Sequence, residues 1–219
     1  TKNKRATLQL VSELSYPLFV KPAHLGSSIG ISRVTQQDQL ENAIEVAVHY
    51  DNLVIVEEAV QNLIEVTVPI MGKEDPIPAL VERPLTNWDD FFDFEAKYIR
   101  EGGKKSGGKK PKGAQGYSEA PAKIGTELYD LSVTTALTAY KAVGCSGMCR
   151  VDLLIDSKTK KVYFNELNPL PGSLYAHNWQ RAGVSPVAPV TRLIELAEAH
   201  QESQIKLQST FSTNFLKQF

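Results

Sequence analysis

Two apolar segments in the second half of the chain constrain the fold most. They read CRVDLLID (residues 149–156) and KVYFNELNP (residues 161–169), and the short polar stretch SKTKK connects them. Both read as strands, and so short a connection predicts an antiparallel hairpin. Charged and amide side chains interrupt both strands, although an unpaired charge inside an apolar strand is costly. We therefore expect these polar side chains to be paired or to serve a site.

Residues two apart in a strand share a face. On the first strand Arg150 and Asp152 then point the same way, and on the second Phe164, Glu166 and Asn168 do so. If the two faces coincide, three oxygen ligands converge beside an arginine. Such ligands suit Mg²⁺ carrying nucleotide phosphates, and the arginine would orient an anionic group. The alternative is a surface hairpin with a salt bridge between Arg150 and one acid.

A second polar feature lies near the start of the chain, in YPLFVKPAHLGSSIGISRV. Residues 16–22 and 29–34 read as two strands of a hairpin around a glycine–serine loop. The motif G-x-x-x-x-G-K-[ST] does not occur in the sequence. Lys21, beside the loop of Gly26, Ser27, Ser28 and Gly30, could still hold phosphate oxygens by charge and backbone N–H groups. The alternative is a solvent-facing turn.

The other periodic segments alternate between strand and helix patterns. We expect a helix within residues 35–50, strands in 52–60 and 64–72, a continuation of that sheet in 79–84, and helices in 126–144 and 185–203. Residues 101–116 are rich in glycine and lysine, and such a composition cannot bury enough apolar surface to order itself. Together these segments predict an α+β fold.

Composition excludes several classes of protein. The net charge of -1 gives no argument for nucleic acid or an anionic membrane as a partner. No apolar run has the length of a membrane span, and the start lacks a signal-peptide pattern. Because the chain opens on Thr1, we expect a fragment of a longer chain. Cys145 and Cys149 have no matching cluster for zinc, and such thiols suit a reducing, cytoplasmic setting.

Five segments, taken in order, resemble the ATP-grasp part of the D-alanine–D-alanine ligase family. They are FVKPAHLGSSIGISRV, VIVEEAV followed by IEVTV, FFDFEAKY, RVDLLI and FNELNPLPG, within Tyr16 to about Ala199. The resemblance implies an ATP-grasp fold, with two α+β lobes and the nucleotide between two antiparallel sheets. We expect the N-terminal lobe in residues 1–60 and the C-terminal lobe in residues 61–219. The family's N-terminal substrate domain is expected to be absent from this chain.

The resemblance also assigns roles to single residues. For ATP it implies Lys21 on the phosphates, Ser27 and Ser28 in the phosphate loop, Glu57 and Val60 at the adenine hinge, Glu65 on the ribose, and Lys97 of the lid. For catalysis it implies Arg150 and the backbone N–H of Gly172 at the oxyanion, and Tyr98 hydrogen-bonded towards the serine loop, which contains the further catalytic residue Ser27. For a pair of Mg²⁺ ions, with Mn²⁺ as an alternative, it implies Asp152, Glu166 and Asn168.

The activity that the resemblance implies is ATP-dependent joining of two D-alanines for peptidoglycan. A carboxylate attacks the γ-phosphate, and an amine then attacks the acyl phosphate. The partners would be D-alanine and ATP in the cytoplasm, and the resemblance allows a homodimer. Where the family places a serine for the second D-alanine's carboxylate, this chain has His177, with Ser173 earlier. A protonated His177 could bind a carboxylate; alternatively it packs at the rim.

Three other functions are compatible with the sequence. One is a D-alanine–D-lactate or other D-amino-acid ligase with the same machinery, which the residues around His177 would distinguish. Another is an ATP-grasp fragment that binds ATP without completing ligation. The missing N-terminal domain argues for this function, and the retained magnesium ligands argue against it. The third is a glutathione-synthetase-like ligase, which explains the acidic hairpin but explains the AKY and NPLPG segments less well.

Overall fold

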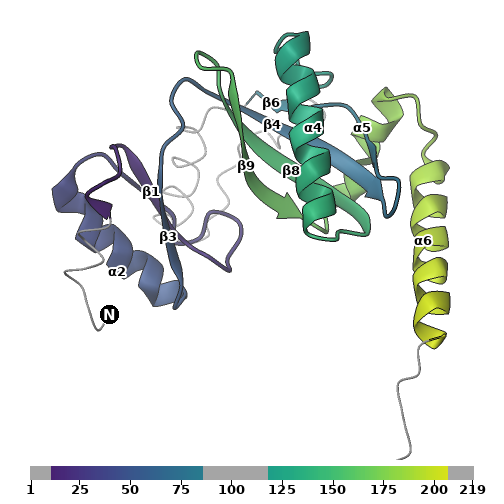
Figure 1. Cartoon of the computed structure of the whole chain (residues 1–219), viewed down its shortest axis with the longest axis horizontal. Helices are drawn as coiled ribbons and strands as arrows, with labels where there is room; N and C mark the ends of the chain where they lie inside the picture. The colour runs from purple at the N-terminus through teal and green to yellow at the C-terminus, as the bar shows by residue number, and fades with distance from the viewer. Residues whose placement is uncertain (1–10, 86–117, 207–219) are drawn as a thin grey trace, which may run out of the picture. The chain divides into compact units, whose positions relative to one another are not determined.

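The structure, a computed structural model, describes residues 11–85 and 118–206 (Figure 1). The chain divides into two compact units, Thr1–Gln61 and Asn62–Phe219. The lid residues Lys97 and Tyr98, and the glycine- and lysine-rich segment 101–116, lie outside the described residues. The predictions made for them stay predictions.

The first unit is built on a three-stranded antiparallel sheet in the order β2-β1-β3. Its elements are β1 (Leu18–Pro22), β2 (Ser32–Val34), η1 (Gln37–Gln39), α2 (Leu40–Tyr50) and β3 (Val54–Glu58). The apolar face of α2 packs on the sheet, where Ala43 and Ala47 meet Leu18 and Val20. The predicted hairpin of β1 and β2 is confirmed, although β2 is shorter than expected because residues 27–30 form turns.

The second unit contains a four-stranded antiparallel sheet in the order β5-β4-β8-β9. Its strands are β4 (Leu63–Gly72), β5 (Ile77–Pro78), β8 (Gly147–Asp156) and β9 (Lys161–Asn168). The predicted hairpin is therefore confirmed as β8 and β9. Helix α4 (Thr126–Ala142) covers one face of this sheet (Figure 1). Its buried side chains pack with alternate residues of the two long strands, among them Val66, Val68, Val151 and Leu153.

A buried tyrosine links α4 to the ends of the two long strands. The hydroxyl of Tyr140 lies 2.7 Å from the carbonyl oxygen of Gly72 and 3.2 Å from that of Gly147. Its side chain is fully buried, so this polar group needs such a partner. These contacts fix the helix over the face of the sheet that carries no candidate site residue.

The segment after β5 departs from the prediction. It continues the sheet only as far as Glu82, which forms an isolated bridge with Thr67 of β4. Beyond it, β6 (Arg83–Pro84) pairs with β7 (Ser118–Glu119) in a separate two-stranded sheet. Pro84 has no N–H to donate, which suits such an edge position. The prediction that residues 79–84 all extend the β4 sheet is therefore wrong for the last two.

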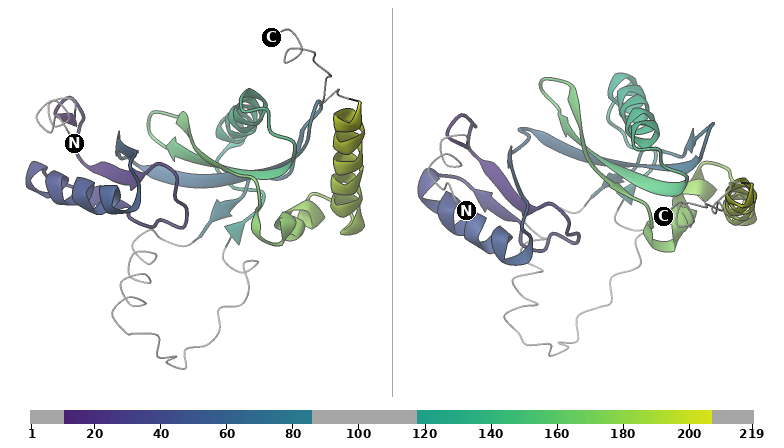
Figure 2. Two further views of the ribbon diagram at one scale, coloured as in Figure 1. Left: turned by 90° about the horizontal axis from the view of Figure 1, so that it is seen from below. Right: turned by 60° about the horizontal axis from the view of Figure 1, so that its bottom comes forward.

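The C-terminal part consists of η3 (Gly172–Tyr175), α5 (Ala176–Arg181) and α6 (Val187–Ile205). The sequence predicts α6 but not the short α5. Within the second unit, α4 lies on one side of the sheet and α5 towards the other (Figure 2, left). Among the residues described, none of the helices combines the length and apolar character that crossing a membrane requires.

Candidate active site

One face of the four-stranded sheet carries a row of polar residues opposite one another. Because alternate residues of β4 and β8 turn towards α4, their neighbours Thr67 and Asp152 point to the opposite face. Asp152 is the register partner of both Thr67 and Glu166, and Thr67 is in turn bridged to Glu82. Glu82, Thr67, Asp152 and Glu166 thus form one row across the sheet.

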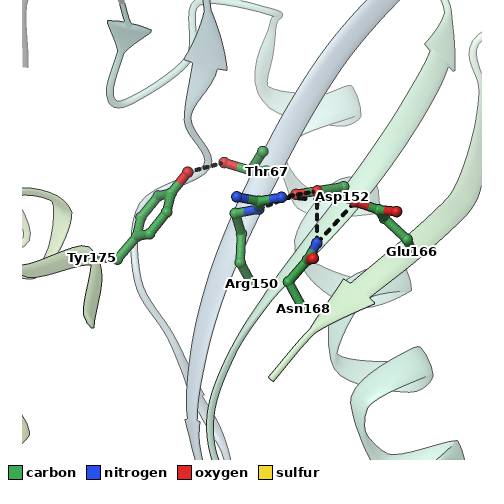
Figure 3. Close-up of polar contacts among 6 residues, drawn as sticks. All are labelled: Thr67, Arg150, Asp152, Glu166, Asn168 and Tyr175. Atoms are coloured by element: carbon green, nitrogen blue, oxygen red, sulfur yellow. Dashed lines mark hydrogen bonds and ion pairs between the residues drawn. The ribbon is translucent and has the colours of Figure 1, made fainter. Parts of the chain in front are cut away.

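Arg150 and Asn168 form the next row on the same face. The guanidinium of Arg150 holds both oxygens of Asp152, with Nε 2.7 Å from Oδ1 and Nη2 2.5 Å from Oδ2 (Figure 3). The same Nη2 lies 3.8 Å from Oε1 of Glu166. The arginine therefore faces two carboxylates, as the strand periodicity predicts.

The amide of Asn168 completes the cluster. Its Nδ2 donates to Oδ2 of Asp152 and to Oε1 of Glu166, each at 3.0 Å (Figure 3). The alternative interpretation, a surface hairpin with a salt bridge, is only partly right. The salt bridge between Arg150 and Asp152 is present, but the Asp152 side chain is only 16% exposed and so does not lie on an open surface. The predicted metal ligands are thus brought together at one place.

Burial dominates the ionisation of Asp152. It raises the pKa of Asp152 to about 6, against the lowering effect of Arg150, and the Glu166 carboxylate adds to the rise. A bound cation would act in the opposite direction, because an opposite charge nearby favours the ionised form.

The donor set fits a hard divalent cation. Two carboxylates and one amide supply oxygen ligands of the kind that Mg²⁺ prefers, and they leave positions for water and phosphate. The Asn168 amide would have to present its oxygen instead of its nitrogen to the cation. In residues 11–85 and 118–206 no group of three or more His, Cys, Asp or Glu side chains is set to hold a metal. The amide of Asn168 is thus the third possible ligand beside the two carboxylates.

A register shift in the hairpin corrects one detail of the prediction. The pairing of β8 with β9 slips between Asp152 and Leu153, so that Leu153 is opposite Phe164 while Asp152 is opposite Glu166. Leu153 belongs to the core face. The period of two that grouped Phe164 with Glu166 and Asn168 therefore fails at this bulge, since the extra residue changes the alternation.

The turn that follows β9 has an unusual backbone. Gly172 opens it and is exposed. Ser173, Leu174 and Tyr175 then have φ of 53°, 48° and 52°. For residues other than glycine the left-handed region costs roughly 1–2 kcal/mol each. The Tyr175 hydroxyl lies 3.5 Å from Oγ1 of Thr67 (Figure 3), which brings the turn onto the polar face of the sheet.

His177 is engaged by a carboxylate of this protein. Its Nε2 lies 2.9 Å from Oε2 of Glu82, and its side chain is 11% exposed. Asn178 donates to the same oxygen at 2.7 Å. Burial raises the pKa of Glu82, but hydrogen bonding from Asn178, Ser118 and His177 outweighs it and holds that pKa below its usual 4.5.

The predicted phosphate residues lie in the first unit. Nζ of Lys21 is 2.6 Å from Oε1 of Glu57 on the neighbouring strand β3. Ser27 and Ser28 have φ of 54° and 56° in the turn between β1 and β2, and Ser27 is exposed. Val60 is half-buried in the connection that follows β3. Lys21 and Glu57, predicted for different parts of ATP, are thus paired in this structure.

In the second unit, Glu65 lies on β4 opposite Leu154, two residues before Thr67 and on the same face. Ser173, predicted for the substrate, is exposed in the η3 turn. These positions leave the predicted roles of both residues untested.

Comparison with known proteins identifies the family. A family model described as the C-terminus of D-alanine–D-alanine ligase matches residues 1–195. The chain belongs to the D-alanine–D-alanine ligase family. The relatives include the D-alanine–D-alanine ligase of Chlorobium chlorochromatii, 40% identical over 190 residues, which cover 85% of this chain and 49% of that protein. D-Alanine–D-alanine ligase A of Escherichia coli K12 is 36% identical over 207 residues, which cover 92% of this chain and 52% of that protein.

Solved structures confirm the α+β, ATP-grasp fold. The VanG D-Ala:D-Ser ligase of Enterococcus faecalis matches with a TM-score of 0.71 and 31% identity, over 89% of this chain and 54% of that one. The D-alanine–D-alanine ligase of Coxiella burnetii, at 24% identity, matches in fold with a TM-score of 0.67. The match covers 92% of this chain and 51% of that one. The chain spans about half the length of the curated relatives that it matches.

Sequence reasoning missed several residues of this member of the ligase family. Thr67, Tyr175 and Asn178 carry no charge and lie in unremarkable positions of the sequence. Glu82 could have been found from the sequence, because it directly follows the apolar run ALV, where an unpaired charge would be costly. The same argument that singled out Asp152 therefore applies to Glu82.

Proposed function

We propose that the complete protein is an ATP-dependent carboxylate–amine ligase that joins two D-alanines for peptidoglycan synthesis in the cytoplasm. The observation that carries the proposal is the convergence of Arg150, Asp152, Glu166 and Asn168 on one sheet face. Membership of the D-alanine–D-alanine ligase family supports this choice of reaction and substrate.

In the first proposed step, the carboxylate of one D-alanine attacks the γ-phosphate of ATP and forms an acyl phosphate and ADP. Such transfers depend mainly on positioning and on neutralising the charge of the phosphoryl group. Bound Mg²⁺ would supply that neutralisation. Asp152, Glu166 and Asn168 would hold the ions, in a pair as the resemblance implies, with Mn²⁺ as an alternative.

Residues of the first unit would hold the nucleotide. The ammonium of Lys21 would donate to a phosphate oxygen, either in place of Glu57 or in addition to it. Phosphate is as strong an acceptor for a charged donor as a carboxylate is. The turned backbone at Ser27 and Ser28 could present N–H groups to phosphate oxygens. Glu57 and Val60 of the same unit keep the adenine role that the resemblance implies. Glu65 and Lys97 of the second unit keep the ribose and phosphate roles that it implies.

In the second step, the amine of the other D-alanine attacks the acyl phosphate, and inorganic phosphate leaves. Charge develops on the carbonyl oxygen, and preorganised donors are most effective when they face that charge. Arg150 and the backbone N–H of Gly172 would stabilise this oxyanion. Tyr98 of the lid would bond towards Ser27, and closure of the lid would protect the acyl phosphate from water.

A second candidate is a ligase of the same mechanism with another second substrate, such as a D-hydroxy acid or a different D-amino acid. One observation favours it. The resemblance implies that His177 stands where the family has a serine, and its Nε2 lies 2.9 Å from Oε2 of Glu82. The second substrate would therefore meet a donor set different from a serine hydroxyl, with Ser173 as a further contact.

The test uses the complete gene product with Mg-ATP and D-alanine, and mass spectrometry to detect the dipeptide. A dipeptide that is lost in Asp152→Ala and Lys97→Ala variants would establish both the reaction and the substrate. Phosphate release with another amino or hydroxy acid, without a D-alanine dipeptide, would select the second candidate. ATP binding without turnover of any acid would refute the ligase proposal and favour a nucleotide-binding module.

A further inference from the structure

Glu82 is a buried acid on the face that carries the proposed ligase site, but it is separate from the metal cluster. It lies in the same cross-strand row as Asp152, two strand spacings or about 10 Å away. Its exposed fraction is 5%. A carboxylate so buried requires charged or hydrogen-bonding partners, and the choice of partners indicates what it does.

Two of those partners come from the beginning of α5. Oε2 of Glu82 accepts from Nδ2 of Asn178 at 2.7 Å and lies 2.9 Å from Nε2 of His177. Asn178 is itself fully buried. Its side chain also accepts from the N–H of Leu80 and donates to the carbonyl oxygen of Leu80, each at 3.0 Å. Two consecutive side chains of α5 are therefore fastened to the strand segment that carries Glu82.

The fastened segment directly follows the left-handed turn. Ser173, Leu174 and Tyr175 are three consecutive residues with φ near 50°, a conformation that side-chain sterics oppose. Such a backbone persists only where surrounding contacts impose it. Within the turn, the N–H of Leu174 donates to the carbonyl oxygen of Pro171 at 3.1 Å. The contacts to other segments come from Tyr175, whose ring centroid is 5.0 Å from that of His177 and whose hydroxyl is 3.5 Å from Oγ1 of Thr67.

We propose that Glu82 is a positioning residue of the ligase: through His177 and Asn178 it holds the Gly172–Tyr175 turn in its left-handed conformation on the polar face of the sheet. This inference rests on the proposed function, because the backbone N–H of Gly172 and the side chain of Ser173 are site groups only in that reaction. Glu82 itself touches neither substrate nor metal in this role. Its loss should therefore disturb the amino-acid subsite and leave nucleotide affinity unchanged.

The experiment compares Glu82→Gln with Asp156→Asn in the complete gene product. Glutamine keeps the size of the side chain but replaces one acceptor oxygen by an NH2 donor. Such a donor cannot accept a hydrogen bond from the N–H groups of His177 and Asn178. Asp156 is a matched control because it is also buried and accepts from Lys158 and Thr159 backbone N–H groups at 2.9 and 3.3 Å. It lies at the other end of β8, about 13 Å along the strand from Asp152.

Two readouts are measured on each variant: hydrogen exchange of the peptide covering residues 171–181, and KM for D-alanine and for ATP. We expect Glu82→Gln to speed exchange in that peptide and to raise KM for D-alanine about tenfold or more, with KM for ATP within about twofold of wild type. We expect Asp156→Asn to lower the melting temperature and leave both readouts unchanged. Glu82→Asp, which keeps the charge but shortens the reach, serves if Glu82→Gln does not fold.

Unchanged exchange in 171–181, or equal kinetic shifts in the Glu82 and Asp156 variants, would overturn the positioning role. Failure of the proposed function has a different signature, because then the wild-type protein makes no dipeptide. In that case the exchange result alone still decides whether Glu82 holds the turn.

Discussion

Arg150 holds both carboxylate oxygens of Asp152 from two positions away on the same strand. Strand alternation places the two side chains on one face, and the bidentate geometry aligns the carboxylate. The arginine therefore compensates the charge of the buried acid. In the proposed reaction a divalent cation would take over part of that compensation, which would let Arg150 face a developing oxyanion.

The first prediction concerns the metal ligands. Asp152→Ala should lower kcat by roughly 100-fold or more, since even residues that only support a metal ligand contribute about 10–100-fold. The Mg²⁺ concentration for half-maximal activity should rise as well. Steady-state kinetics over a Mg²⁺ titration measure both. Asp130→Asn, an exposed acid on α4, is the control, and a similar loss in that variant would contradict a specific role for Asp152.

The second prediction concerns Asn168. Its amide donates to two carboxylates at 3.0 Å each, so Asn168→Asp would place three acids together. Without metal the free energy of unfolding should fall by about 3 kcal/mol or more, because two hydrogen bonds to charged groups, each contributing about 1.5–3 kcal/mol, are lost. Mg²⁺ should restore most of this difference. Thermal unfolding with EDTA and with Mg²⁺ measures the effect. Equal destabilisation in the two conditions would argue against a cation at this site.

The third prediction concerns pH. The pKa of Glu82 is held below its usual 4.5 in the folded protein, so the folded state prefers the ionised form more than the unfolded state does. The resulting stability is present above about pH 4.5 and is lost as the pH falls through the lowered folded pKa.

Glu82→Gln removes this contribution. The difference in unfolding free energy between wild type and Glu82→Gln should therefore be large at pH 7 and should shrink below about pH 4.5. Denaturant unfolding at a series of pH values from neutral to acidic measures it. A difference that stays constant across the series would mean that Glu82 is not stabilised in its ionised form.

The fourth prediction concerns Lys21. Its ion pair with Glu57 is partly exposed: the Lys21 side chain is 20% exposed and the Glu57 side chain 39%. Such partly exposed pairs contribute less than about 1 kcal/mol to the free energy of unfolding. Lys21→Met should therefore leave unfolding nearly unchanged but raise KM for ATP about tenfold or more. Lys141→Met, at the end of α4, is the matched control. A stability loss without a change in KM for ATP would make the lysine structural.

Several parts of the fold and site could be predicted from the sequence because they depend on local rules. The β8–β9 hairpin follows from two strands and a short polar connection. The shared face of Arg150 and Asp152 follows from strand alternation, and so does that of Glu166 and Asn168. The one failure of that rule, Phe164, arises from a bulge whose position depends on how the neighbouring strand pairs.

The Glu82 network could only be decided by the tertiary structure. Its partners His177 and Asn178 lie 95 and 96 residues along the chain, and no local preference relates positions so far apart. The left-handed turn of Ser173, Leu174 and Tyr175 contains no glycine after Gly172, so propensity argues against its conformation. Sequence alone determined which residues could carry charge and metal. Packing of distant segments decided which backbone those residues must adopt, because only buried long-range contacts can impose a conformation that the local chain disfavours.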